Sequence, residues 1–470
     1  SPRPKWASRG AKRVAVSGAA EDRASQSVVY EYLAWAVAWL LIGSFYGTLA
    51  AWKFVFPDLL PVEWLSFGRI RPIHTTSIFS GWLSLGLIGL AYLVVCQTSR
   101  RPLYSPALAR IALWLLNLAL LAGLLTLSLG MTRGPVEYRE WLTPVAAVFA
   151  AGVILNGINI FLTLLRRRTE ELYISNWFIL GAFAWAPILY VIAYLPAFDS
   201  GMANVVIQAY FMHVVLGLWF TLLVVGITYW SLPRLLRKPI YSYALGVLAF
   251  WANLIFYPLI GAHHFIFTPL PWWLQSTAIA LGVGMLIPVI ATSANFLLTM
   301  RRSWRFIRHE PALWFIMAGA LCYALASAQG TLQAFRTANA LLHFSNNTIG
   351  HAHFTAYGFV SLLMFGAISG QRLFAARSSA APHVRLQFWL SLGGLAIYVV
   401  AMTASGVLQG LSWAAERPFI DSVVASAPWY LLRAIGGSLM ALSHLVFAWN
   451  LWLMRPQQQL LPAAAAEPAQ

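Results

Sequence analysis

Six of the ten histidines in this 470-residue chain form a pattern that could bind metals. Each lies in or beside an apolar segment, where a polar side chain is costly to bury and usually has a function. Neutral imidazole is a ligand for copper, zinc and iron, including haem iron. The six are His74, His213, His263, His264, His351 and His353.

The spacing of His351 and His353 indicates two different metals. Residues two apart on an α-helix point about 200° away from each other, so these two imidazoles cannot share one ion. They can instead ligate two planar cofactors on opposite faces of the helix, as axial imidazoles ligate haem iron. His74 is then available as the opposite ligand of one haem, which would make that haem a six-coordinate, low-spin electron carrier.

The adjacent pair His263 and His264 could combine with His213 at a third centre. Three imidazoles with an open coordination position suit a single non-haem ion of copper, zinc or iron. The remaining four histidines have simpler interpretations. His309 and His383 fall in polar connections, His343 precedes a span, and a lone buried histidine such as His444 more often makes a helix–helix hydrogen bond than binds a metal.

The elements that must position these histidines are membrane helices. The chain is 60% hydrophobic and 10% charged, with a mean hydropathy of +0.70, whereas soluble domains carry about 25% charged residues. Its apolar stretches exceed the ~20 residues that cross a bilayer. We expect an all-α integral membrane protein with spans near 30–55, 72–97, 106–130, 141–166, 174–195, 204–232, 242–266, 274–300, 312–337, 346–376, 385–412 and 427–454.

The charge distribution predicts the direction of these spans. The net charge of +17 does not indicate nucleic-acid binding, because most Lys and Arg cluster in alternate connections and at the two ends of the chain. This alternation follows the positive-inside rule and places both termini in the cytoplasm. With that direction, all six histidines lie in one layer near the outer face. The protein would then be a multi-pass protein of a bacterial inner (plasma) membrane.

Three regions follow from the same pattern. Residues 1–29 are basic and have no apolar core of a signal peptide, so we expect a disordered cytoplasmic tail there. Residues 30–455 form the transmembrane catalytic domain, and the Ala/Pro/Gln-rich residues 456–470 form a disordered tail. The chain has no C-x-x-C-H motif, so no c-type haem is covalently attached to it.

Several segments resemble one enzyme family. "RIRPIHTTSIFSGW", "YFMHVVLGLWFT", "YPLIGAHHFIFTPLPWW" and "NNTIGHAHFTAYGF" are similar to the catalytic subunit I of haem–copper oxygen reductases, and "KPIYSY", "SNWF", "SGVLQGLSW" and "LLRAIGGSLM" extend the likeness over nearly the whole chain. The resemblance is greatest to the C-family, the cbb3-type cytochrome c oxidases. It implies a twelve-transmembrane-helix haem–copper oxidase bundle and a respiratory oxidase that reduces dioxygen to water, coupled to proton uptake.

The resemblance also implies roles for single residues. His74 and His353 match the axial ligands of a low-spin haem b, and His351 matches the axial ligand of a high-spin haem b. His213, His263 and His264 match the three copper ligands. Tyr257 matches the catalytic tyrosine that is covalently linked to the first copper ligand. It lies ~9 Å deeper than His263 on an α-helix, where it could face His213.

The likeness is incomplete along the proton path. The spans have no Asp or Glu in their interiors, and the family takes protons instead through polar residues on the seventh span. Tyr241, Ser242 and Tyr243 are present there, but two polar positions are Gly246 and Ala249, and a family glutamate on the ninth span is Gln329. Asn253, one turn below Tyr257, could relay protons with water. These differences leave proton pumping open.

Nitric oxide reductase of the same superfamily is the alternative function. Those enzymes typically carry a glutamate four residues after the first metal histidine, where this chain has Gly217, and they usually lack a tyrosine at position 257. Both features favour oxygen as the substrate. A membrane electron-transfer cytochrome or a transporter would not need His-x-His together with His-His, nor Tyr257.

Charged residues predicted on the outer side could support the cofactors. Arg69, Arg71 and Arg336 are candidate partners of haem propionates, because the planar guanidinium pairs well with carboxylates. Glu137 and Glu140 could hold a cation linked to a propionate, and calcium is the candidate ion. We expect electrons to come from c-type cytochrome subunits and cytochrome c, or from quinol. The expected substrate is dioxygen. The protein should be surrounded by membrane lipid and should not bind nucleic acid.

Overall fold

A computed structural model describes residues 5–134, 136–371 and 381–455, and every regular element in these ranges is a helix. Twelve spans within them are long and apolar enough to cross a membrane, which confirms the predicted number. The longer elements are α1 (Lys5–Trp52), α2 (Phe67–Thr76), α3 (Ser84–Ser99), α4 (Pro106–Ser128), α5 (Thr143–Leu165), α6 (Ile174–Tyr194), α7 (Gly201–Val215), α8 (Leu222–Leu236), α9 (Tyr243–Phe256), α10 (Trp272–Gly284), α11 (Leu286–Met300), α12 (Trp304–His309), α13 (Pro311–Ala334), α14 (Arg336–Leu342), α15 (Asn346–His353), α16 (Leu362–Ser369), α17 (Ala381–Ala414) and α18 (Phe419–Leu453).

Six short elements complete the described parts of the chain. Two are single 3-10 turns in connections, and the other four lie inside or at the ends of spans. They are η1 (Glu63–Leu65), η2 (Ser77–Leu83), η3 (Pro196–Phe198), η4 (Leu216–Thr221), η5 (Tyr257–Phe265) and η6 (Phe354–Ser361).

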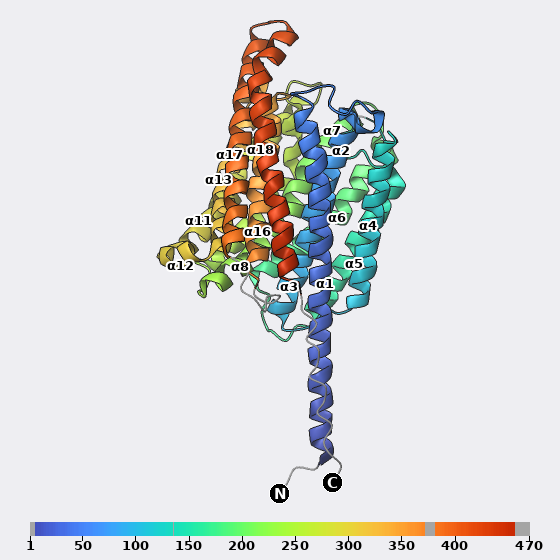
Figure 1. The fold of residues 1–470 in the computed structure, drawn as a ribbon, viewed down its shortest axis with the longest axis vertical. Coiled ribbons are helices and arrows are strands. Elements are labelled where there is room, and N and C mark those ends of the chain that lie inside the picture. Colours follow the sequence, from blue (N-terminus) through green and yellow to red (C-terminus); the bar gives the residue numbers. More distant parts are fainter. Residues whose placement is uncertain (1–4, 135, 372–380, 456–470) are drawn as a thin grey trace.

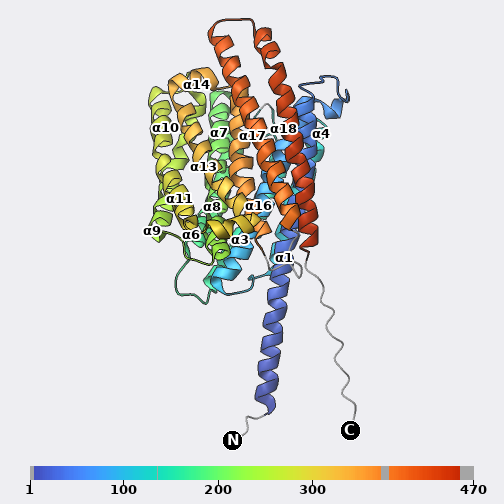
Figure 2. The ribbon, with the colours of Figure 1, turned by 60° about the vertical axis from the view of Figure 1, so that its left-hand side comes forward.

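The two ends of the bundle are different in character. Figure 1 shows α2 and α7 near one end, and the N-terminal part of α1 together with α12 at the other. We call the first the histidine end, because the six candidate ligands lie in its half of the bundle, and the second the arginine end, after the Arg-rich connections there. The last two helices, α17 and α18, run side by side and extend beyond the histidine end (Figures 1 and 2).

The first span differs from the expectation at its N-terminal side. Residues 5–29, predicted as part of a disordered tail, are helical and continuous with the first span, so that α1 projects beyond the bundle (Figure 1). The physical reason is local: no proline follows Pro4 in this stretch, and Ala, Arg, Lys and Glu favour helix. The predicted C-terminal tail, 456–470, lies outside the described residues.

Three spans change their winding directly after a histidine-bearing segment. The π-helical turns η2, η4 and η6 follow α2, α7 and α15 without a break, and the last turns of those helices contain His74, His213, and His351 with His353. π-Helical turns within α-helices occur frequently at functional sites. Each of these spans is therefore divided into a histidine-bearing half and a packed half.

One hydrogen-bond pattern joins helix pairs at the arginine end. The Ser105 side chain caps α4, and Asn159 of α5 binds the Ser105 backbone N–H and carbonyl at 3.0 and 2.9 Å. Ser242 caps α9 in the same way, and Asn295 of α11 binds its N–H and carbonyl at 3.0 and 2.7 Å. Because the N–H groups of Ser105 and Ser242 lie outside regular helix, the buried amides satisfy donors that would otherwise be unpaired.

Candidate metal centres

His74 and His353 face each other across a cavity between α1, α2, α15 and α18. Their ring centroids are 6.2 Å apart and their planes differ by 12°. A metal between two imidazoles needs about 4 Å from nitrogen to nitrogen, because each metal–nitrogen bond is about 2.0 Å. A centroid separation of 6.2 Å is compatible with this nitrogen–nitrogen distance, because the centroid of each ring lies farther from the metal than its ligating nitrogen does. The pair therefore fits the two sides of one haem.

Backbone carbonyls fix the orientation of both rings. His74 Nδ1 lies 2.7 Å from the Gly43 carbonyl, and His353 Nδ1 lies 2.9 Å from the Ile349 carbonyl. An Nδ1–H that donates to a carbonyl leaves Nε2 unprotonated and available to a metal, as in most histidine-ligated sites. Gly47 completes the support for His74, because a Cβ at that position would overlap the imidazole ring.

The cavity between these rings has a volume of about 170 Å³ and is mostly apolar. Arg71 and Arg433 line it, and Arg71 forms an ion pair with Glu137. Arg433 is 8% exposed, its guanidinium lies over the Phe54 ring, and its Nε has no hydrogen-bond partner among the described residues. A buried arginine with an open donor fits a carboxylate-bearing occupant such as a haem propionate. Sequence reasoning named Arg69, Arg71 and Arg336 as candidates and missed Arg433.

A second candidate centre brings His213, His263 and His264 together. Their ligand nitrogens all lie within 4.8 Å of one another, and His213 Nδ1 is 2.8 Å from His264 Nε2. His263 is buried and its Nδ1 has no partner among the described residues. Three neutral donors without a carboxylate suit copper or zinc better than magnesium or calcium. The cluster therefore fits one transition-metal ion.

Tyr257 lies against this cluster. Its ring centroid is 5.4 Å from that of His213, with a 33° angle between the planes. The segment Tyr257–Phe265 is a 3-10 helix rather than the expected α-helix, and the rings of Tyr257 and His263 lie 5.4 and 4.5 Å from the ring of His213. Gly217 provides the space, since a Cβ there would overlap the Tyr257 ring.

His351 lies on the other side of the same span from His353. Its Nδ1 is 3.1 Å from Gln329 Oε1, and its ring packs on Gly330, where a Cβ would come within 3.0 Å. Gln329 also contacts Asn347 at 3.5 Å through its amide nitrogen. The amide oxygen accepts from Nδ1–H, which leaves the His351 Nε2 for a metal. His343, to which no function was assigned, lies near the cluster of His213, His263 and His264, with its ring 5.9 Å from that of His264.

The other charged candidates lie at the histidine end. Arg69 pairs with Glu63. Arg336 lies over the Trp272 ring at 3.6 Å and donates to Ser276 Oγ at 3.2 Å, and its Nε has no partner among the described residues. Arg336 does not line the cavity between His74 and His353.

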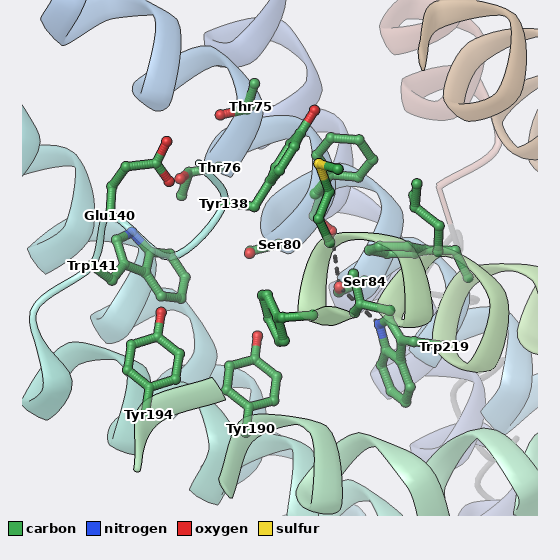
Figure 3. Close-up of a pocket in the computed structure, with 16 residues that line it drawn as sticks. Thr75, Thr76, Ser80, Ser84, Tyr138, Glu140, Trp141, Tyr190, Tyr194 and Trp219 are labelled. Carbon is green, nitrogen blue, oxygen red and sulfur yellow. Dashed lines mark hydrogen bonds between the residues drawn. The ribbon is translucent and has the colours of Figure 1, made fainter. Parts of the chain in front are cut away.

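Glu140 lines a smaller cavity of about 60 Å³ beside the second, fifth and sixth spans. Figure 3 shows its carboxylate among Thr75, Thr76, Tyr138 and Trp141, with Tyr190 and Tyr194 on the opposite wall. Burial raises the pKa of Glu140 to about 7, against a smaller lowering by Arg71, whose guanidinium is 3.6 Å away. Arg71 thus contacts both Glu137 and Glu140.

Comparison with known proteins agrees with this geometry. The sequence profile of the family described as "Cytochrome C and Quinol oxidase polypeptide I" matches residues 27–439. The chain is 29% identical over 459 residues to the cbb3-type cytochrome c oxidase subunit CcoN1 of Stutzerimonas stutzeri, covering 93% of this chain and 96% of that protein. It is 23% identical to a nitric oxide reductase polypeptide of the same organism, covering 95% of this chain and 97% of that protein.

A solved structure shares the fold. It is described as a haem–copper terminal oxidase dimer, and it superposes with a TM-score of 0.74 at 17% identity, covering 92% of this chain and 84% of the other. At this identity the likeness concerns the twelve-helix architecture alone.

Proposed function

This chain belongs to the family of cytochrome c and quinol oxidase polypeptide I, and we propose that it is the catalytic subunit of a cbb3-type terminal oxidase that reduces dioxygen to water. The observation that carries this proposal is the contact between Tyr257 and His213 beside three clustered imidazoles. A phenol next to a metal site can supply a proton and an electron together, which the cleavage of an O–O bond requires.

Each histidine has one role in this proposal. His74 and His353 hold a low-spin haem b, His351 holds a high-spin haem b, and His213, His263 and His264 hold copper. When bound, the two haems and the copper ion supply the electron transfer and the oxygen chemistry. The chain itself orients the ligands through Gly43, Ile349 and Gln329, and it holds Tyr257 at the copper cluster.

Arginines complete the haem sites. Arg71 and Arg433 line the cavity between His74 and His353 and are the proposed partners of the low-spin haem propionates. Arg336 is the proposed partner on the side of the high-spin haem, because Asn339 of the same helix, α14, contacts the His263 carbonyl at 3.4 Å. A calcium ion held by Glu137 and Glu140 is also proposed, and it would compete with Arg71, which contacts both carboxylates.

Protons are proposed to approach Tyr257 from the arginine end. Buried polar side chains lie on α9, α11 and α13: Asn253 Oδ1 has no hydrogen-bond partner among the described residues, and the hydroxyls of Thr292 and Tyr323 lie close enough to bond each other. Buried polar atoms without protein partners commonly bind water. Water joining them would bypass Gly246 and Ala249, which carry no polar side chain.

The membrane orientation and the partners are also inferred. Positive residues at the arginine end favour a cytoplasmic location for that end and for both termini, with the metal centres near the outer face. Electrons would arrive from c-type cytochrome subunits and cytochrome c, or from quinol.

Nitric oxide reduction is less well supported. The nitric oxide reductase relative is 23% identical, and a glutamate at position 217 would need the space that the Tyr257 ring occupies. Oxygen is therefore the proposed substrate.

Metal analysis and turnover of the purified complete enzyme test this proposal. We expect two haems and one copper per chain, with turnover of oxygen in the presence of reduced cytochrome c. Tyr257→Phe should lose oxygen reduction and keep both haem spectra. Iron in place of copper, with turnover of nitric oxide only, would overturn the assignment.

A further inference from the structure

A hydrogen-bonded pair lies at one end of the cavity between His74 and His353. His444 of α18 and Ser44 of α1 meet there, with His444 Nδ1 2.6 Å from Ser44 Oγ. Ser44 Oγ is also 2.6 Å from the Leu40 carbonyl, which can only accept. Because a serine hydroxyl has one proton, that proton goes to Leu40 and the His444 Nδ1–H must donate to Ser44 Oγ. The tautomer of His444 is therefore fixed.

This tautomer leaves an open acceptor on the other ring nitrogen. In a neutral imidazole with a proton on Nδ1, Nε2 carries a lone pair. His444 is 5% exposed, its Nε2 has no partner among the described residues, and the residue lines the cavity. The helix–helix hydrogen bond that we expected for a lone buried histidine is present, but it uses only one of the two nitrogens.

The position of His444 along α18 relates it to the low-spin haem. The cavity-lining residues of this helix form one stripe: Arg433, Gly437, Met440, Ala441 and His444. Arg433 and His444 are eleven residues apart, which is about 16 Å along the helix axis. Gly437 and Ala441 between them have little or no side chain, so a flat macrocycle can approach. One end of the stripe thus carries a cation, and the opposite end carries a neutral acceptor.

We propose that His444 is a positioning residue for the low-spin haem, whose Nε2 accepts a hydrogen bond from an O–H group at the macrocycle edge opposite the propionates. This inference rests on the proposed function, because it requires a haem between His74 and His353. The O–H group can belong to a hydroxyl substituent of the haem or to an ordered water over the edge of an unmodified haem b. Both sources present the same donor to the same lone pair.

A space-filling role does not account for the pair. An aliphatic side chain would fill the same position without placing an unpaired nitrogen in an apolar cavity. Ser44 would then also be unnecessary, although its hydroxyl is buried and oriented by Leu40. The pair is explained if the occupant of the cavity supplies the missing donor.

The test uses the purified complete oxidase and three variants. His444→Leu removes the acceptor. Ser44→Ala removes the partner of Nδ1 and allows the other tautomer, which presents Nε2–H to the haem edge. Thr228→Val is the matched control, because it deletes a buried hydroxyl that donates to the Val224 carbonyl at 2.7 Å on α8 and does not line the cavity. The measurements are the midpoint potential of the low-spin haem, its resonance Raman spectrum in H₂O and D₂O, and the mass of the extracted haems.

We expect the midpoint potential to rise in His444→Leu, because a nitrogen lone pair at the edge stabilises the more positive ferric state. Ser44→Ala should raise it as well, Thr228→Val should leave it unchanged, and the deuterium shift of the wild-type Raman bands should vanish in His444→Leu. A hydroxylated haem mass identifies the substituent as the donor, and an unmodified mass identifies water. Either haem mass supports the proposal, provided that the midpoint potential of the low-spin haem rises in His444→Leu.

One outcome overturns the inference alone. It is a His444→Leu enzyme with a normal bis-imidazole spectrum, an unchanged midpoint potential and an unchanged deuterium shift. A wild-type enzyme that lacks a bis-imidazole low-spin spectrum would instead overturn the proposed function, so the two failures are distinguishable. If His444→Leu does not assemble, Ser44→Ala gives the same decision through the potential.

Discussion

The phenol ring of Tyr257 occupies the space in which a side chain at position 217 would lie. The Tyr257 ring, at the junction of α9 and η5, packs directly on Gly217 of η4, and its centroid lies 5.4 Å from that of the His213 ring. Glycine at position 217, one helical turn beyond His213, is therefore needed to place the phenol beside the three clustered histidines.

The first prediction concerns that glycine. Gly217→Ala should displace Tyr257 from His213 and reduce oxygen turnover at least tenfold, because misplacing a reacting group by about 1 Å can cost 10²-fold. Haem content should stay the same. Oxygen consumption by the purified enzyme measures the effect. Gly393→Ala is the control, since nothing lies within 4 Å of a Cβ there, and equal turnover in both variants would contradict the prediction.

The second prediction concerns the ligand of the high-spin haem. Gln329→Glu replaces a neutral acceptor of the His351 Nδ1–H by a carboxylate, and charge-assisted hydrogen bonds are roughly twice as strong. A more electron-rich imidazole stabilises ferric iron, so the midpoint potential of the high-spin haem should fall. Gln329→Leu should move it in the opposite direction. Spectroelectrochemical titration decides the matter, and identical potentials in all three enzymes would show that Gln329 does not act through His351.

The third prediction concerns the support of His74. Gly47→Ala puts a methyl group into the His74 ring and should displace the imidazole from its Gly43 hydrogen bond. We expect loss of the low-spin haem spectrum with retention of copper. Gly68→Ala, on α2 with open space around it, is the matched control. A low-spin spectrum unchanged in Gly47→Ala would exclude His74 as an axial ligand held in this way.

The fourth prediction concerns stability at the arginine end. Asn159→Ala removes the partner of the part-buried Ser105 N–H, which costs about 1–3 kcal/mol for an unpaired group, while the Ser105 carbonyl keeps its bond from the Ala109 N–H at 3.2 Å. The temperature at which the purified enzyme loses its native fluorescence should therefore fall by several degrees. The haem spectra should remain normal below that temperature. A melting temperature equal to that of wild type would show that water replaces the amide without loss.

The spacing of the histidines predicted the candidate site well because the spacing itself limits the geometry. His351 and His353 must point apart on any α-helix, and alternating charge sets the end at which each span carries its ligands. The contact of Tyr257 with the cluster was anticipated through the family resemblance. The α-helical winding expected for its segment was wrong, because Tyr257–Phe265 is a 3-10 helix; Pro258 at the start of that segment was the available signal.

Other features could not be predicted without the packing. Arg433 and His444 are eleven residues apart on one face of α18, but only the structure shows that this face lines the cavity between His74 and His353. The role of Gly47 depends on a contact with a residue on another helix, and no local pattern indicates it. The helical residues 5–29 were misjudged because a basic, polar composition was given more weight than helix propensity.

The π-helical turns after the ligand-bearing segments have a consequence for how this architecture can vary. A π turn accommodates about one extra residue, and one residue corresponds to a rotation of about 100° around a helix axis. The two halves of each interrupted span therefore have independent rotational phases. Substitutions that repack the packed halves of these spans need not change the orientation of the imidazoles. Conversely, the histidine-bearing halves can rotate while the packed halves keep their contacts.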